Sequence, residues 1–358
     1  MPKKKIKVFV AMSGGVDSSV AAALLKRADF DVVGVYMKCW TANDPLYQGC
    51  TSQDDERSAR LAASHLGIPF YTWNFIKEYK ERVVEYLIEG YKKGITPNPD
   101  IMCNKEIKFG LFFEKAMKLG ADMVATGHYA RIVHEIPNSK LLQAIDKNKD
   151  QSYFLSFIKP NVLSRVLFPI GNYTKPQVRA LAKKFGLPNA ERKESQGICF
   201  IGKLDFTDFL KQHIPLEPGN IVDTKGTVLG KHQGLALYTI GQRKEIRLSG
   251  GPWYVVEKDY KANTLVVSKD EKELGKKEAQ ITNMNWLSDV LPAESQKVDV
   301  KIRYRTPSAP ANLELASPKT PNIPNYKLVF EKPQRAVTPG QFAVLYKGEQ
   351  LLGGGVIE

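Results

Sequence analysis

Short apolar runs alternate with amphipathic stretches along the first half of the chain. Residues 6–12, 32–37, 69–75 and 122–126 are rich in β-branched and aromatic residues, as expected of strands. The stretches between and after them carry apolar residues at helical spacing, and they predict helices over 54–66, 77–93, 104–119 and 174–185. Strands that alternate with helices predict an α/β fold, a parallel sheet with helices on both faces. Ligands of such sheets bind at the carboxyl ends of the strands.

From about residue 215 the pattern changes to short apolar runs separated by glycine and proline. These runs predict strands over 219–223, 234–241, 253–257, 264–268, 298–304, 327–330, 341–346 and 351–357. They fit two small mainly β domains, the last a β-barrel of the type that often carries nucleic acid. We therefore expect a catalytic domain over 1–205, a central β-rich domain over 206–280 and a barrel over 281–358.

The charge of the chain indicates a polyanionic partner. Its 358 residues carry a formal charge of +14, and residues 1–205 contribute +10 of it, from 31 basic and 21 acidic side chains. Basic surfaces gain free energy by displacing counterions from phosphates, although a basic surface can also serve solubility alone. No stretch approaches the ~18 apolar residues of a membrane span, and the basic start lacks the apolar core of a signal peptide. We expect a cytoplasmic protein with no membrane partner.

The four cysteines, Cys39, Cys50, Cys103 and Cys199, are too scattered for a disulfide scaffold. They form no C-x-x-C pair, and we expect no protein-bound metal site. In a reducing compartment, a cysteine of functional importance would be catalytic.

The most informative motif is Ser13-Gly-Gly-Val-Asp-Ser-Ser19, between a predicted strand and a predicted helix. Gly14 and Gly15 allow backbone N–H groups to surround an anion, and the helix start favours negative charge. No Gly-Lys-Ser/Thr follows, so the loop is not a Walker A motif. It resembles the PP-loop of ATP pyrophosphatases, which bind ATP by its pyrophosphate end and transfer AMP.

Two cysteines lie in loops suited to chemistry. Cys103 follows a proline-rich loop and is expected at or just before a helix start, which favours the thiolate. Asp100, three residues earlier, is close enough to move a proton. Cys199 lies in the Gly-flanked segment 194–202, where the backbone can approach closely. Taken alone, each cysteine could equally be a small buried hydrophobe.

Together, motifs along nearly the whole chain resemble the tRNA-specific 2-thiouridylases. They are Ala-Met-Ser-Gly-Gly-Val-Asp-Ser (11–18), Tyr-Met-Lys (36–38), Asn-Pro-Asp (98–100), Ala-Thr-Gly-His-Tyr-Ala-Arg (125–131), Lys-Asp-Gln-Ser-Tyr-Phe-Leu (149–155), Gly-Ile-Cys-Phe-Ile-Gly (197–202), Thr-Ile-Gly-Gln-Arg (239–243), Arg-Tyr-Arg (303–305) and Pro-Gly-Gln (339–341). The PP-loop is common to many enzymes, whereas two cysteines in these contexts are far more specific.

The resemblance implies a role for each matching residue. ATP would be bound by Ala11, Met12, Ser13, Gly14, Gly15, Val16, Asp17, Ser18, Met37 and Gly127. The wobble uridine would meet Asn98, Pro99 and Asp100, and other parts of the tRNA would meet His128, Lys149, Asp150, Gln151, Arg303, Tyr304 and Gln341. Cys199 would carry a persulfide, Cys103 would be the second catalytic thiol, and Asp100 the acid/base partner.

The implied reaction is the ATP-dependent 2-thiolation of that uridine. Adenylylation turns the C2 carbonyl oxygen into a leaving group, and sulfur then replaces it. The persulfide sulfur either attacks C2 directly or is freed as hydrosulfide by Cys103, and a Cys103–Cys199 disulfide results. Mg²⁺ would accompany ATP, and a cysteine desulfurase or a sulfur-relay protein would supply the sulfur. Another PP-loop ligase, acting on tRNA or a small molecule, or an inactive tRNA-binding protein, is the alternative; the substrate tRNAs, the donor and the oligomeric state stay open.

Overall fold

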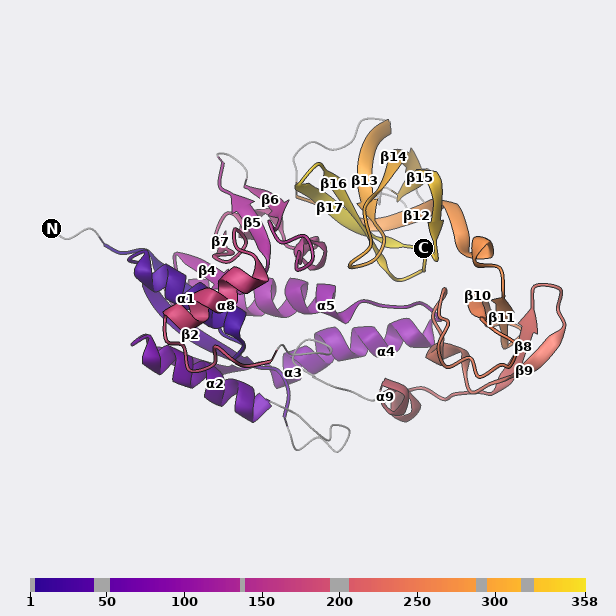
Figure 1. The fold of residues 1–358 in the computed structure, drawn as a ribbon, viewed down its shortest axis with the longest axis horizontal. Coiled ribbons are helices and arrows are strands. Elements are labelled where there is room, and N and C mark those ends of the chain that lie inside the picture. Colours follow the sequence, from indigo (N-terminus) through magenta and orange to yellow (C-terminus); the bar gives the residue numbers. More distant parts are fainter. Residues whose placement is uncertain (1–3, 42–51, 136–138, 194–205, 288–294, 317–324) are drawn as a thin grey trace.

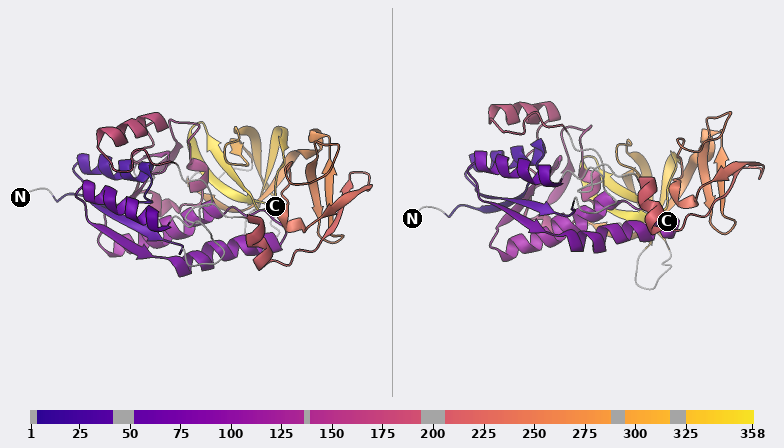
Figure 2. Two further views of the ribbon diagram at one scale, coloured as in Figure 1. Left: turned by 60° about the horizontal axis from the view of Figure 1, so that its bottom comes forward. Right: turned by 90° about the horizontal axis from the view of Figure 1, so that it is seen from below.

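The computed structural model describes residues 4–41, 52–135, 139–193, 206–287, 295–316 and 325–358. It contains an α/β part, a small β part and a barrel, so the predicted fold class is confirmed (Figure 1). Along the long axis of the molecule the barrel lies between the α/β part and the small β part (Figure 2). Within the described ranges, no helix is both long and apolar enough to cross a membrane.

The α/β part is built on a parallel five-stranded sheet. Its strands are β1 (Lys7–Ala11), β2 (Asp31–Lys38), β3 (Phe70–Asn74), β4 (Met123–Thr126) and β7 (Val166–Leu167), in the order β3-β2-β1-β4-β7. The chain leaves β1 toward β2 and β3 and later returns on the other side as β4. The carboxyl ends of β1 and β4 therefore flank a topological switch point, where ligands of such sheets bind.

Helices cover both faces of this sheet, and alternate residues of β1 are therefore buried in two different clusters. Val8 and Val10 pack against the face of α1 (Val16–Arg27) and α2 (Ser52–His65). Phe9 and Ala11 face the opposite cluster, which contains Phe112. An apolar run buried on both sides is what a central parallel strand requires. The helix α8 (Lys175–Lys184) packs beside α1.

Two long helical runs complete the α/β part, and each contains a π-helical stretch. The first consists of α3 (Ile76–Tyr79), η1 (Lys80–Val84) and α4 (Glu85–Lys92). The second consists of α5 (Pro99–Met102), η2 (Cys103–Phe112) and α6 (Phe113–Lys118). The expectation that Cys103 lies at or just before a helix start is therefore wrong. The run begins at Pro99, since the Oδ1 atom of Asn98 accepts from the Ile101 N–H at 3.2 Å and proline suits a first helical position.

The small β part has the strand order β10-β11-β8-β9. Its elements are α9 (Phe206–His213), β8 (Gly219–Asp223), β9 (Val228–His232), η4 (Leu235–Leu237), β10 (Tyr254–Asp259), β11 (Thr264–Ser268) and η5 (Glu271–Leu274). The predicted strand over 234–241 is wrong, because residues 235–237 form the 3₁₀ turn η4 and the rest of the segment is irregular. Gly234 and Gly241, at its two ends, have φ values of 136° and 83°, which no regular strand uses.

Six antiparallel strands form the closed barrel: β12 (Gly275–Trp286), β13 (Ser295–Lys301), β14 (Ala309–Ala316), β15 (Asn325–Arg335), β16 (Phe342–Lys347) and β17 (Gln350–Ile357). Closure comes from the pairing of β12 with β17. Since β12 lies wholly within this sheet, we propose that the barrel begins at about Gly275, not at residue 281.

A hairpin of the α/β part extends the barrel sheet. It is formed by β5 (Ala130–Val133) and β6 (Lys140–Gln143), and β6 pairs with β17. It is followed by η3 (Ser152–Leu155) and α7 (Pro160–Leu163). The barrel is thus joined to the α/β part by a continuous ladder of backbone hydrogen bonds.

Candidate active site

The Ser13–Ser18 loop has the geometry of an anion site at the carboxyl end of β1. Gly14 has a φ of 81°, and a Cβ atom there would lie 2.2 Å from the Asp55 carbonyl oxygen, so only glycine fits. The Ser18 Oγ atom accepts from the Ser13 N–H at 3.1 Å. Gly15 is the N-cap of α1 and has no side chain to cap it. The first N–H groups of α1 are thereby available to a phosphate.

Three donors from distant segments fix the orientation of this loop. The carbonyl oxygen of Gly14 accepts from Ser58 Oγ at 2.7 Å, Asn189 Nδ2 at 2.9 Å and Arg192 Nη1 at 3.1 Å. Arg192 also forms an ion pair with Asp55. A carbonyl held in this way points into the protein and away from a bound anion. Sequence reasoning missed these three residues, because they share no local motif with the loop.

Asp17, in the first turn of α1, is held by a cation that the sequence did not indicate. The Lys175 ammonium, at the start of α8, donates to both carboxylate oxygens, at 2.7 and 2.8 Å. The Tyr129 hydroxyl donates to Oδ1 at 2.9 Å. The side chain of Lys175 is only 10% exposed, against 31% for Asp17. The carboxylate beside the PP-loop therefore carries its own counter-charge.

The loop after β4 connects the PP-loop to the helix that carries Cys103. A Cβ atom on Gly127 would lie 2.5 Å from the Ser18 backbone nitrogen, so this glycine permits the close approach. The next residue, His128, is buried, with Nε2 3.3 Å from the Lys108 ammonium and Nδ1 2.7 Å from Thr126 Oγ1. Lys108 lies in η2, five residues after Cys103. Segments far apart in sequence therefore meet along one rim of the sheet.

His128 is neutral in this setting. Burial, and secondarily the adjacent Lys108 ammonium, hold the pKa of the imidazole well below its usual range. A neutral ring that accepts from Lys108 at Nε2 carries its proton on Nδ1, which then donates to Thr126 Oγ1. The ring is thus fixed inside the protein.

Cys103 is fully buried, with 0% of its surface exposed, and lies one turn inside its helical run. Asp100 is partly exposed in the first turn, three residues earlier, so the two side chains share a face of the helix. The Asn104 side chain donates to the Asp100 carbonyl oxygen at 3.0 Å. Cys199 and the rest of 194–202 lie outside the described residues. In the described part of the chain, no group of three or more His, Cys, Asp or Glu could hold a metal ion.

The expected tRNA residues over 149–151 make internal contacts. Asp150 is buried; Oδ1 accepts from the Ala144 N–H at 3.0 Å, and Oδ2 lies 3.3 Å from the Lys301 ammonium of the barrel. The Gln151 Oε1 atom accepts from the Tyr129 N–H at 3.0 Å. Lys149 is partly buried. Asp150 thus links the α/β part to the barrel through Lys301, and Gln151 stabilises the loop beside the PP-loop.

The expected tRNA residues of the barrel are also engaged within the protein. The Arg303 Nη2 atom donates to Ile240 O at 2.9 Å, Ala336 O at 3.1 Å and Thr338 Oγ1 at 2.7 Å. Tyr304 packs on Phe154, with ring centroids 4.3 Å apart. Gln341 donates to the Thr96 carbonyl oxygen at 2.8 Å. Contact of any of these side chains with tRNA stays a prediction.

Comparison with known proteins places the chain among enzymes of tRNA. Three family models match in succession: "tRNA methyl transferase HUP domain" over 6–203, "tRNA methyl transferase PRC-barrel domain" over 207–269 and "Aminomethyltransferase beta-barrel domain" over 276–357. The tRNA-specific 2-thiouridylase MnmA of Pseudomonas putida (strain GB-1) is 44% identical over 99% of this chain and 95% of its own length. Its counterpart in Stutzerimonas stutzeri (strain A1501) is 45% identical over the same shares. Among solved structures, a 4-thiouridine synthetase–RNA complex with bound ATP matches over 58% of this chain and 50% of its own chain, at 19% sequence identity. The TM-score of this match is 0.37, which is too low to carry an inference.

Proposed function

The chain belongs to the family of tRNA-specific 2-thiouridylases, and from this membership we propose that it uses ATP to replace the C2 oxygen of the wobble uridine of tRNA with sulfur. It is a PP-loop sulfurtransferase of tRNA. The geometry agrees with this membership: the PP-loop lies at the switch point of the sheet, on the same rim as the helix of Asp100 and Cys103.

ATP fits the PP-loop for electrostatic reasons. The start of α1, which no side chain caps among the described residues, and an inward-facing Gly14 carbonyl favour a phosphate group there. The counter-charge of Lys175 on Asp17 limits repulsion between this carboxylate and the nucleotide. We propose that Mg²⁺ enters with ATP as the counter-ion of its phosphates, whose negative charge needs to be neutralised.

The chemistry proceeds in two stages. In the first, the uracil O2 attacks the α-phosphate, pyrophosphate leaves, and O2 becomes part of an AMP ester. In the second, the terminal sulfur of a Cys199 persulfide attacks C2 and AMP departs with the original oxygen. The Cys103 thiolate then attacks the Cys199 sulfur, which leaves 2-thiouridine and a Cys103–Cys199 disulfide. The Cys103 thiolate is oxidised as the transferred sulfur is reduced, the Cys199 sulfur stays at the disulfide level, and external thiols then reduce the disulfide.

Asp100 is the proposed acid/base group, because it shares a helix face with Cys103 and is partly exposed to solvent. Cys103 itself is fully buried, so the uridine must leave its stack and enter the protein to be reached. We retain the cytoplasm as the proposed location, and a cysteine desulfurase or a sulfur-relay protein as the proposed donor.

The test is mass analysis of nucleosides from tRNA incubated with the protein, ATP, Mg²⁺ and a persulfide source. Exchange of oxygen for sulfur in uridine, with AMP and pyrophosphate as products, supports the proposal. A methylated nucleoside would favour the activity named by the first two family models. Stoichiometric ADP would exclude AMP transfer.

Variants assign the two thiols. Cys199→Ser should accept no sulfur from a desulfurase, whereas Cys103→Ser should be loaded with persulfide but fail to complete transfer. Both should still form AMP-tRNA, since activation uses the PP-loop. Normal thiolation by both variants would refute the two-thiol mechanism and favour another PP-loop ligase.

A further inference from the structure

The barrel contacts the catalytic part at the segment that leads into the helix of Asp100 and Cys103. The Thr96 N–H donates to the Pro339 carbonyl oxygen at 2.9 Å, and the Gln341 side chain donates to the Thr96 carbonyl oxygen at 2.8 Å. One turn, Pro339–Gln341, therefore holds both backbone polar groups of Thr96. Thr96 is buried, so water cannot replace these bonds without an opening of the structure.

The contact is close as well as hydrogen-bonded. Gly340, with a φ of 86°, lies so near that a Cβ atom there would be 2.8 Å from Ile95 Cβ and 2.9 Å from the Thr96 nitrogen. On the other side, a Cβ atom on Gly90 of α4 would be 2.7 Å from Pro97 Cγ. The segment before the catalytic helix is thus enclosed between α4 and the barrel turn.

Few degrees of freedom separate Thr96 from the catalytic residues. Pro97 and Pro99 fix their own φ angles, and proline restricts the residue before it, which here includes Thr96 and Asn98. Asn98 then caps the helix that carries Asp100 and Cys103. A displacement of Thr96 would consequently be passed on to both catalytic side chains.

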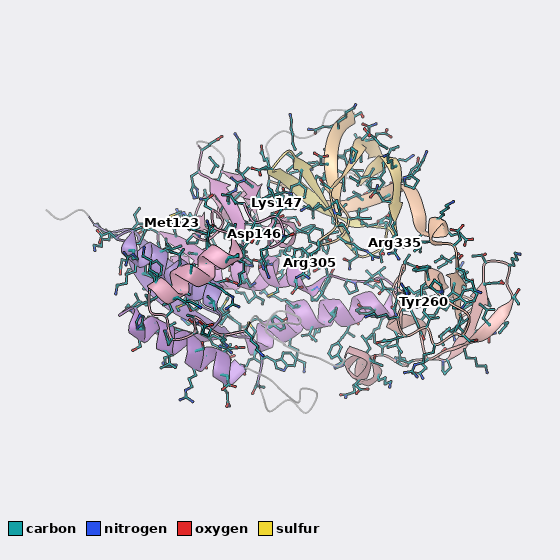
Figure 3. The ribbon with its side chains drawn as sticks, viewed as in Figure 1. Met123, Asp146, Lys147, Tyr260, Arg305 and Arg335 are labelled. Atoms are coloured by element: carbon teal, nitrogen blue, oxygen red, sulfur yellow. The ribbon has the colours of Figure 1, made fainter. Side chains whose placement is uncertain are left out.

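The same turn is anchored to the small β part. Arg303 joins Ile240 of that part to Ala336 and Thr338, the residues just before the turn. Arg335 donates to the Gly241 carbonyl oxygen at 3.3 Å and lies where the barrel meets the small β part (Figure 3). The barrel, the small β part and the catalytic segment are therefore connected in series through residues 335–341.

We propose that Gln341, with Gly340, is a positioning residue that sets the place of Asp100 and Cys103. The inference rests on the proposed function. It predicts that loss of the Gln341 donor slows sulfur transfer within the bound complex and leaves the affinity for tRNA unchanged.

The test compares Gln341→Met with Gln334→Met. Methionine keeps the length of the side chain without the donor, and Gln334 is a barrel glutamine whose Nε2 donates only to the nearby Lys332 carbonyl oxygen in the described part of the chain. Three quantities are measured: the dissociation constant for tRNA, the single-turnover thiolation rate at saturating tRNA, and hydrogen exchange of the peptide containing Thr96 without ligands.

For Gln341→Met we expect hydrogen exchange at Thr96 to be about 10-fold faster and the thiolation rate to be about 10-fold slower than in wild type. The affinity for tRNA should stay within about 2-fold of wild type. Gln334→Met should resemble wild type. Gly340→Ala provides a second perturbation of the same turn and should give the same pattern.

Unchanged exchange at Thr96, or weaker tRNA binding with an unchanged rate at saturation, would overturn the positioning role. If wild-type protein thiolated no tRNA, the proposed function would fail, whereas the exchange measurement would still decide whether the turn holds the segment.

Discussion

The ion pair between Asp17 and Lys175 gives a quantitative test of how the PP-loop tolerates a carboxylate beside a polyanion. Lys175→Met removes the ammonium that donates to both oxygens of Asp17 and leaves the carboxylate charge uncompensated. A carboxylate about 6 Å from a phosphate oxygen raises the free energy of the complex by about 3 kcal/mol at an effective dielectric constant of about 20. That corresponds to about a hundredfold in the dissociation constant for ATP. Because Asp17 is 31% exposed, screening by solvent should reduce the effect to about 10- to 50-fold.

The double variant distinguishes two roles of the lysine. If Lys175 acts by neutralising Asp17, Asp17→Asn combined with Lys175→Met removes both charges and should restore most of the affinity. If Lys175 binds the phosphates itself, the double variant should bind ATP as weakly as Lys175→Met. Equilibrium dialysis with radiolabelled ATP measures the affinity, and urea denaturation reports the stability of each variant. Lys183→Met is the control, since Lys183 lies on α8 like Lys175 but pairs with Glu191, an exposed residue beyond the helix. Equal affinities of the double variant and Lys175→Met would refute the neutralising role.

Three further predictions concern stability and binding. Asp150→Ala should lower the free energy of unfolding by about 3 kcal/mol in urea denaturation, because it leaves the mostly buried Lys301 ammonium without its carboxylate, whereas Lys147→Met, at an exposed pair with Glu349, should change it by less than about 1 kcal/mol. Burial lowers the pKa of Lys258 to about 8, so between about pH 8 and 10.4 the unfolded chain binds a proton that the folded chain does not, and stability rises with pH. Lys258→Met should therefore be more stable than wild type at pH 7 by about 1–3 kcal/mol, and an advantage that did not shrink by pH 10 would contradict this. The affinity for tRNA should fall steeply with salt in filter binding, and a salt-independent affinity would reduce the basic α/β part to a solvated surface.

Local signals made the central features predictable. The strands of the parallel sheet are short, apolar and rich in β-branched residues. The PP-loop is indicated by two glycines between a strand and a helix. Both signals arise from neighbouring residues. The helix start at Pro99 also had a local signal, Asn98 followed by proline, but the two prolines suggested a loop and the start was placed about one turn too late.

The features that escaped prediction depend on contacts between distant segments or on exposed surfaces. Asn189, Arg192 and Lys175 reach the PP-loop from more than 150 residues away, and no local pattern records this. The strand β12 was missed because its first four residues are exposed and largely charged, so its first half has no apolar alternation. The roles expected for Arg303 and Gln341 came from the resemblance alone, which does not describe their partners within the protein.

The pairing of β6 with β17 has a consequence for the synthesis of the protein. Roughly 200 residues separate the two strands along the chain. At translation rates of about 5–20 residues per second, about 10–40 s pass between the synthesis of β6 and that of β17. Throughout this interval the hairpin presents an unpaired strand edge, which is a template for association with other chains. A chain that stopped before β17 would keep this edge exposed, because β17 both closes the barrel and covers the β6 edge of the catalytic part.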